Sequence, residues 1–156
     1  MKHVKQFFNL KNFDIENIVK ELYNPLSLGV LSIPNFIDAE FRNQLISEIS
    51  KCPFVEGPKV YLNARQDLEY FVISETDKES NYLGLSAKQF SQVFLLRESY
   101  DALYKIIAKE AQFQGNAQIN YVIVQRYRAG SIGIEQHLDE SKYINLTSIF
   151  IIDENL

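Results

Sequence analysis

The sequence has little of what marks secreted, membrane-spanning or nucleic-acid-binding proteins. It holds one cysteine, Cys52, so no disulfide can form within the chain and nothing indicates an oxidising compartment. No apolar run approaches the roughly 20 residues that span a bilayer, and polar residues interrupt the N-terminal segment before it gains the apolar core of a signal peptide. These absences predict a cytoplasmic protein with no membrane partner.

Basic residues are not in excess either. The 156 residues include 16 lysines and arginines against 20 aspartates and glutamates, which gives a formal net charge of -4. This balance offers no general basic surface to a phosphate backbone, so nucleic acid is disfavoured as a partner and a small molecule or protein side chain is favoured as the substrate. The hydrophobic content of 46% predicts a packed globular chain, and its length predicts a single domain, residues 1–156.

Helical patterns fill the first part of the chain and strand patterns the last. Apolar residues recur at three- and four-residue spacing after the capping residues Asp14 and Asp38 and again after Ser86, with a break or bend near Arg97. The expected helices are 14–24, 38–52 and 86–111. Runs of β-branched and aromatic residues predict strands at 29–34, 60–62, 70–74, 119–127, 132–134 and 144–152.

This order of elements predicts an α+β fold. Residues 1–115 would supply helical support and the N-terminal strands, and residues 116–156 the core strands. Because the strongest strands come last, we expect helices packed on a mainly antiparallel sheet and not alternating βαβ units. Polar composition predicts loops at 53–69, apart from the strand at 60–62, and at 75–81, which we expect to be a mobile surface loop.

The segment that most suggests chemistry contains His137 and Asp139. In an extended chain, side chains two residues apart point to the same side, so this imidazole and carboxylate can hold one metal ion. His-x-Asp is also the contiguous part of the two-His-one-carboxylate triad that binds non-heme Fe(II) and leaves coordination positions open. The alternative is a solvated turn in which Asp139 caps the backbone and His137 caps or stacks, since so short a motif often arises by chance.

A wider pattern surrounds this pair. Residues 124–139 read Val-Gln-Arg-Tyr-Arg-Ala-Gly-Ser-Ile-Gly-Ile-Glu-Gln-His-Leu-Asp. The series resembles the core of the AlkB-like and prolyl-hydroxylase-like iron(II)- and 2-oxoglutarate-dependent oxygenases, in which Asn or Gln, one residue and then Tyr on a strand precede a glycine turn and His-x-Asp. The resemblance covers residues 119–152, and nothing comparable covers residues 1–115.

The resemblance implies a double-stranded β-helix, the jelly-roll fold of the cupins, with Fe(II) and 2-oxoglutarate as cofactors and with hydroxylase or oxidative demethylase activity. His137 and Asp139 would be metal ligands, and Gln125 and Tyr127 would contact 2-oxoglutarate. Arg126 matches an arginine common in the same motif. Strand alternation predicts Arg126 on the face opposite to Gln125 and Tyr127, where the plainer interpretation is a surface arginine.

The sequence departs from this family after Asp139. The distal histidine and the arginine that the family carries on later strands are both missing there, and His3 is the only other histidine. Three explanations stay open: a truncated part of a longer oxygenase, a non-catalytic binding domain that retains the fold, or a site completed by a partner chain. The apolar strand expected at 144–152 favours truncation and a jelly roll incomplete at its C-terminus, because such a strand expects neighbours; unpaired edges would also favour a homodimer.

Overall fold

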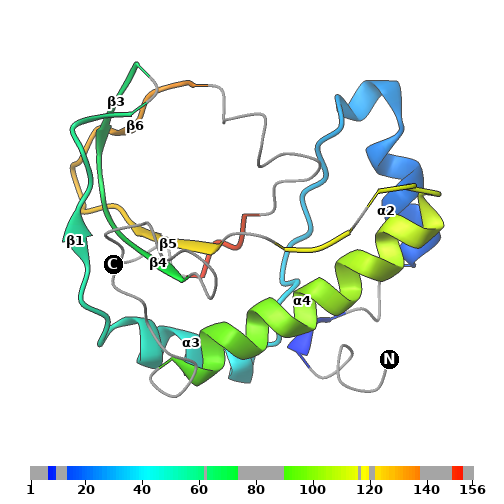
Figure 1. Ribbon diagram of the computed structural model, residues 1–156, viewed down its shortest axis with the longest axis horizontal. Coiled ribbons are helices and arrows are strands. Elements are labelled where there is room, and N and C mark those ends of the chain that lie inside the picture. Colours follow the sequence, from blue (N-terminus) through cyan, green and yellow to red (C-terminus); the bar gives the residue numbers. More distant parts are fainter. Residues whose placement is uncertain are drawn as a thin grey trace. The chain divides into compact units, whose positions relative to one another are not determined.

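The computed structural model describes residues 7–9, 14–61, 63–73, 90–115, 117–119, 122–137 and 149–152. Within these residues the chain has helices α2 (Ile15–Leu22), α3 (Ala39–Ile49) and α4 (Ser91–Glu110), together with two small antiparallel sheets (Figure 1). The α+β fold with antiparallel strands is therefore confirmed. The described strands do not close into a barrel.

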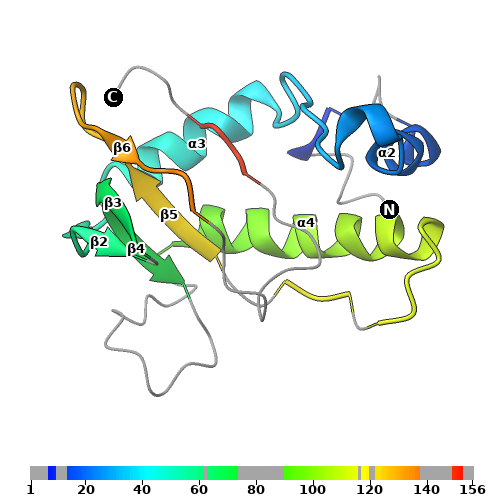
Figure 2. The same ribbon diagram turned by 90° about the horizontal axis from the view of Figure 1, so that it is seen from above.

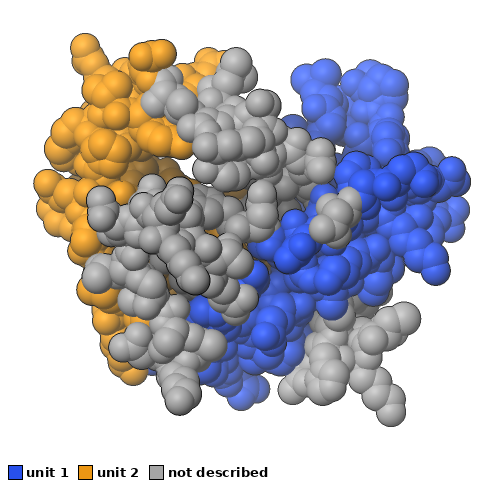
Figure 3. Space-filling model, in the orientation of Figure 1, with its two compact units in different colours: residues 1–47, 91–119 blue, residues 48–90, 120–156 orange. Residues whose placement is uncertain are grey.

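Contacts divide the chain into two compact units, each made of two separate segments. Unit 1 comprises Met1–Ser47 and Ser91–Ile119, and unit 2 comprises Glu48–Phe90 and Asn120–Leu156. Figure 3 colours the two units separately. The described residues of the 124–139 pattern, called the motif below, belong to unit 2, whereas α2 and α4 belong to unit 1. A single domain stays a prediction.

Capping side chains determine where the first helices begin. The Asp14 carboxylate accepts a hydrogen bond from the Glu16 backbone N–H at 3.3 Å, directly before α2. Asp38 accepts from the backbone N–H groups of Glu40 and Phe41 at 3.0 and 3.2 Å, directly before α3. An oxygen in this position satisfies amides that have no partner within the helix, so both predicted N-caps are confirmed.

Helix α4 runs from Ser91 to Glu110 as one element, so a break near Arg97 is wrong, and the alternative of a bend stays a prediction. Its buried residues recur along one stripe. Burial of that stripe stabilises the helical conformation, including the turn that contains Arg97 and Glu98. These residues are Val93, Phe94, Leu96, Ser99, Leu103, Ile107 and Ala108. Helix α2 packs beside α4 and buries Ile18 (Figures 1 and 2).

The strand expected at 29–34 is also wrong. A short 3-10 helix, η2 (Pro25–Ser27), ends there, and Leu28 and Gly29 follow with φ angles of 53° and 76°. This left-handed backbone turns the chain away from the extended conformation, and residues 30–33 have no regular structure. Residues 149–152, the described part of the strand expected at 144–152, are likewise not in a strand. The loop expected at 75–81 lies outside the described residues.

Unit 2 contains both sheets. One has the order β1 (Val55–Glu56), β4 (Glu69–Ile73), β5 (Val122–Arg126), and the other has the order β2 (Val60–Tyr61), β3 (Ala64–Asp67), β6 (Gly133–Ile134). In Figure 2, β4 and β5 lie side by side. The strands expected around residues 60, 70, 122 and 133 are confirmed as β2, β4, β5 and β6.

The prediction that residues 53–69 form a loop with one short strand is wrong, because β1 and β3 also lie there. β3 has the polar sequence Ala-Arg-Gln-Asp, yet Ala64 and Gln66 are buried in alternation with exposed positions. The Gln66 side chain donates to the Pro58 carbonyl at 2.6 Å, which allows a polar residue to occupy a buried strand position. In the other sheet, buried Phe71 of β4 contacts the rings of Phe54 and Phe90, with centroid distances of 5.1 and 5.9 Å.

Candidate functional site

The two strands of the candidate motif pair with one nearly continuous stretch of chain. β5 pairs with β4, and β6 pairs with β3, both antiparallel. Leu68 alone separates β3 from β4, whereas residues 127–132 separate β5 from β6. Residues 127–132, called the motif loop below, are therefore an insertion whose two ends are both held by β-pairing.

Gln125 and Tyr127 lie together at the start of this loop. Exposure alternates along β5, with Ile123 and Gln125 exposed and Arg126 half-buried on the other face. The Tyr127 hydroxyl donates a hydrogen bond to the Gln125 side-chain oxygen at 3.1 Å. Partial burial of the ring, which is 39% exposed, raises the pKa of Tyr127, so the hydroxyl is a neutral donor. The predicted cosubstrate residues are thus adjacent.

Two glycines shape the motif loop and its exit. The Ser131 backbone N–H donates to the Arg128 carbonyl at 3.0 Å, closing a turn in which Gly130 has a φ of 79°. Glycine adopts this conformation without a steric penalty, as the predicted glycine turn requires. Gly133 has a φ of 69°, and a Cβ atom placed there would lie 3.9 Å from the Tyr127 ring. The ring therefore lies beside the first residue of β6.

His137 follows β6 on an anchored backbone. Glu135 donates its backbone N–H to the Arg65 carbonyl at 2.9 Å, and its carboxylate accepts from the Arg65 backbone N–H at 2.8 Å, which extends the β3–β6 pairing. His137 Nδ1 lies 2.9 Å from the Glu135 carbonyl oxygen. Because a carbonyl can only accept, this hydrogen bond places a proton on Nδ1, and in the neutral imidazole the lone pair is then on Nε2. Asp139, the second predicted metal ligand, lies outside the described residues.

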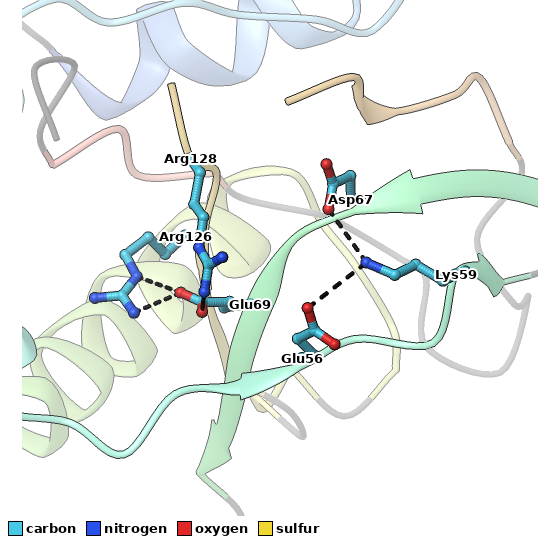
Figure 4. A network of polar contacts seen from close by, with 6 residues as sticks. All are labelled: Glu56, Lys59, Asp67, Glu69, Arg126 and Arg128. Carbon is cyan, nitrogen blue, oxygen red and sulfur yellow. Dashed lines mark hydrogen bonds and ion pairs between the residues drawn. The ribbon is translucent and has the colours of Figure 1, made fainter. Parts of the chain in front are cut away.

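Sequence reasoning missed a buried carboxylate, Glu69, that binds two arginines of the motif (Figure 4). Arg126 donates to one carboxylate oxygen through Nε at 2.8 Å and through Nη2, and Arg128 donates to the other oxygen. Glu69 is 8% exposed. Hydrogen bonds from both guanidinium groups hold the pKa of Glu69 below its usual range, and the pKa of Arg128 is raised in return.

Arg126 lies on the face opposite to Gln125, as alternation predicts, and its side chain is partly exposed but paired. Its guanidinium carbon lies 4.1 Å from the centre of the Phe54 ring, and its carboxylate partner is Glu69, its register partner in β4. The available signal was a carboxylate, Glu69, at the start of β4 and an arginine, Arg126, at the end of β5. Pairing these ends requires the antiparallel register, which the sequence alone does not reveal.

A second charge cluster lies on the neighbouring strands. Lys59 Nζ is 3.4 Å from Asp67 and 3.8 Å from Glu56, and all three side chains are well exposed. Exposed pairs of this kind contribute little to stability because solvent screens them. Together with Glu69 and its two arginines, these residues make a network of three carboxylates and three cations (Figure 4).

Comparison of the chain with protein-family models, with curated proteins and with solved structures finds no match. Function has to be inferred from the residues themselves. Within the described part of the chain, no three His, Cys, Asp or Glu side chains gather in a group that could hold a metal ion, and no helix there is long and apolar enough to cross a membrane.

Proposed function

We propose that this chain is an iron(II)- and 2-oxoglutarate-dependent dioxygenase, or a part of one, that acts as a hydroxylase or oxidative demethylase. The observation that carries the proposal is the orientation of His137, whose Nδ1 donates to the backbone carbonyl of Glu135. Histidines that bind metals in proteins usually donate their other ring N–H to a carbonyl or carboxylate, which fixes the ring and makes the ligating nitrogen more basic. His137 is arranged in this way.

The donor types also fit a ferrous ion. A neutral imidazole from His137 and a carboxylate from Asp139 suit a borderline divalent metal and leave positions for a bidentate oxo acid. When bound, the iron would supply the chemistry that couples the oxidative decarboxylation of 2-oxoglutarate to hydroxylation of a substrate C–H bond, with dioxygen as the oxidant of both. The residues of the chain would bind and orient the reactants.

Gln125 and Tyr127 support the cosubstrate assignment. Gln125 projects from the exposed face of β5, Tyr127 directly follows that strand, and the hydroxyl and amide are already within hydrogen-bond distance of each other. In the proposed complex the Tyr127 hydroxyl would redirect its proton from Gln125 to a carboxylate oxygen of 2-oxoglutarate. A carboxylate is the stronger acceptor, so the exchange is favourable.

The proposed fold is a double-stranded β-helix to which the two antiparallel sheets would contribute. The proposed setting is the cytoplasm, and the proposed substrate is a small molecule or a protein side chain, with nucleic acid disfavoured by the net charge of -4. A homodimer is the proposed assembly.

An anaerobic titration with Fe(II) and 2-oxoglutarate, followed by the visible charge-transfer band of the ternary complex, tests the proposal. We expect a band with the wild-type chain, its loss in His137→Ala and Asp139→Ala, and a weaker cosubstrate affinity in Tyr127→Phe. His3→Ala is the matched control, because it removes the other histidine of the sequence.

The outcomes separate the alternatives. A band that survives His137→Ala would contradict the assignment of this ligand. No band in any variant would contradict a complete oxygenase site in these residues and would leave a truncated part of an oxygenase or a non-catalytic binding domain that keeps the motif. Loss of the band in His3→Ala as well as in His137→Ala would instead identify His3 as a further ligand.

A further inference from the structure

One buried carboxylate holds the two residues that flank Tyr127 in the sequence. Glu69 binds Arg126 through one oxygen and Arg128 through the other, so the backbone on both sides of Tyr127 is tied to β4. The two guanidinium groups approach the carboxylate from different directions in Figure 4. The side chains of Glu69 and Arg126 lie on the face of the sheet opposite to the exposed Gln125.

We propose that Glu69 is a positioning residue that clamps the start of the motif loop and thereby holds Tyr127 in place beside Gln125 for the cosubstrate. This inference rests on the proposed function for the identity of the cosubstrate, but the clamp itself is a property of the loop. Glu69 acts through the two arginines and does not touch the outward face of β5.

Packing gives the motif loop little support, which is why a clamp matters. The Arg128 side chain is 68% exposed, and Gly130 has no atom within 4 Å of the position that a Cβ would take. Two charge-assisted hydrogen-bonding partners on a buried carboxylate are stronger and more directional than neutral contacts. The clamp is therefore the main restraint that the described contacts provide between Arg128 and the sheet.

Charge balance argues against a different role for the two arginines, the binding of an anionic ligand. Arg126 and Arg128 face Glu69, and the neighbouring groups are Lys59, Glu56 and Asp67 (Figure 4). This network has as many carboxylates as cations, so it has no excess positive charge to offer. The low pKa of Glu69 agrees with a carboxylate that stays charged and engaged at neutral pH.

Amide hydrogen exchange on the 156-residue chain tests the clamp without reference to function. The Ser131 amide reports on the turn of the motif loop, because it donates to the Arg128 carbonyl, and the Glu135 amide reports on the β3–β6 pairing. In Glu69→Gln and Arg128→Ala we expect exchange at Ser131 to accelerate by on the order of ten-fold, with Glu135 unchanged. Lys59→Ala is the matched control, since it breaks the neighbouring exposed ion pairs and leaves Glu69 intact.

Exposed Arg128 can be replaced without threatening the fold, so Arg128→Ala remains decisive even if Glu69→Gln unfolds. Equal exchange at Ser131 in Arg128→Ala and Lys59→Ala would overturn the clamp. A second readout is the NMR signal of 13C-labelled tyrosine, assigned with Tyr127→Phe. It should shift in Arg128→Ala and not in Lys59→Ala, and be restored towards wild type in Arg128→Lys.

Binding measurements then separate this inference from the proposed function. With iron present, Arg128→Ala should weaken 2-oxoglutarate binding by on the order of ten-fold and leave Fe(II) affinity unchanged. Equal loss of both affinities would contradict a positioning role. A wild-type chain that binds neither ligand would reject a complete oxygenase site in these residues, and the exchange and NMR results would still decide whether Glu69 clamps Tyr127.

Discussion

Glu69 lies directly opposite Arg126 in the antiparallel register of β4 and β5, and the two side chains form a salt bridge on the less exposed face of the sheet. Opposite charges at directly paired positions stabilise one register of two strands over its neighbours. Shifting β5 by one residue would place Gln125 or Tyr127 against the carboxylate and would turn Arg126 to the outward face. The salt bridge thus helps determine which residues of the motif face outwards.

The Glu69 carboxylate should make stability depend on pH in the acid range. Its folded pKa lies below its unfolded value, so the unfolded state binds more protons between the two values and stability rises with pH there. The contribution is complete above the ordinary glutamate pKa of about 4.3 and is lost as the pH falls through the folded pKa. In urea unfolding, the free energy of unfolding of wild type minus that of Glu69→Gln should be constant at neutral pH. It should shrink as the pH falls below the ordinary glutamate pKa of about 4.3.

The same substitution at exposed Glu110 is the control and should change the free energy of unfolding by less than about 0.5 kcal/mol at neutral pH. A difference for Glu69→Gln that persisted undiminished into strong acid would contradict the ion pairs as its source.

Removal of a buried leucine should destabilise unit 1 far more than removal of an exposed one. Leu45 in α3 is 0% exposed, so Leu45→Ala should lower the free energy of unfolding by about 2–5 kcal/mol. Leu26 is 91% exposed, and Leu26→Ala should change it by less than about 0.5 kcal/mol. Urea titrations followed by circular dichroism measure both; equal effects would contradict the described packing of α3.

Local signals in the sequence predicted the elements whose determinants are local. Asp14 and Asp38 act as N-caps because the carboxylate needs only the amides two and three residues ahead. The strand expected at 29–34 failed for the opposite reason: its apolar residues suit a strand, but Leu28 and Gly29 adopt left-handed angles that its composition does not indicate. Propensity describes a residue, whereas these angles depend on the turn that precedes it.

Contacts between distant segments could not be predicted in the same way. The motif predicted that Gln125 and Tyr127 share a face, because alternation is a property of one strand. Glu69 is far from Arg126 and Arg128 in the sequence and joins them only once β4 and β5 are paired. The position of Asp139 relative to His137, on which the metal site depends, stays a prediction.

Cys52 should react slowly with thiol reagents in the folded chain. Burial, and secondarily the charge of Glu48, raise the pKa of its thiol to about 11, and its Sγ donates to the Glu48 carbonyl at 3.7 Å. At pH 8 about one molecule in a thousand would carry the reactive thiolate, so reaction with a disulfide reagent should be roughly two orders of magnitude slower than for a free cysteine.

Because Cys52 is the only cysteine, the released chromophore reports on this site alone. Unfolding in urea is the control and should restore the ordinary rate. Rapid reaction of the native chain would contradict the burial of this thiol.

Alanine and asparagine should rank in opposite order for stability when they replace Gly130 and when they replace Gly57, two glycines of unit 2. Gly130 has a φ of 79° and open space where a Cβ would lie, so its restriction is conformational. Gly130→Ala should cost about 1–2 kcal/mol of stability, and Gly130→Asn less, because asparagine tolerates left-handed angles better. At Gly57 the restriction is steric, since a Cβ would lie 3.1 Å from Leu68 Cδ1 and 3.2 Å from the Leu68 carbonyl oxygen.

A larger side chain at Gly57 cannot relieve that contact, so Gly57→Asn should be less stable than Gly57→Ala. Urea unfolding of the four variants measures both orders. If alanine were better than asparagine at both positions, size alone would explain the results and the left-handed turn at Gly130 would be contradicted. If the orders are opposite, the glycine turn of the motif is required for its backbone angle, as the resemblance to the oxygenase motif predicts.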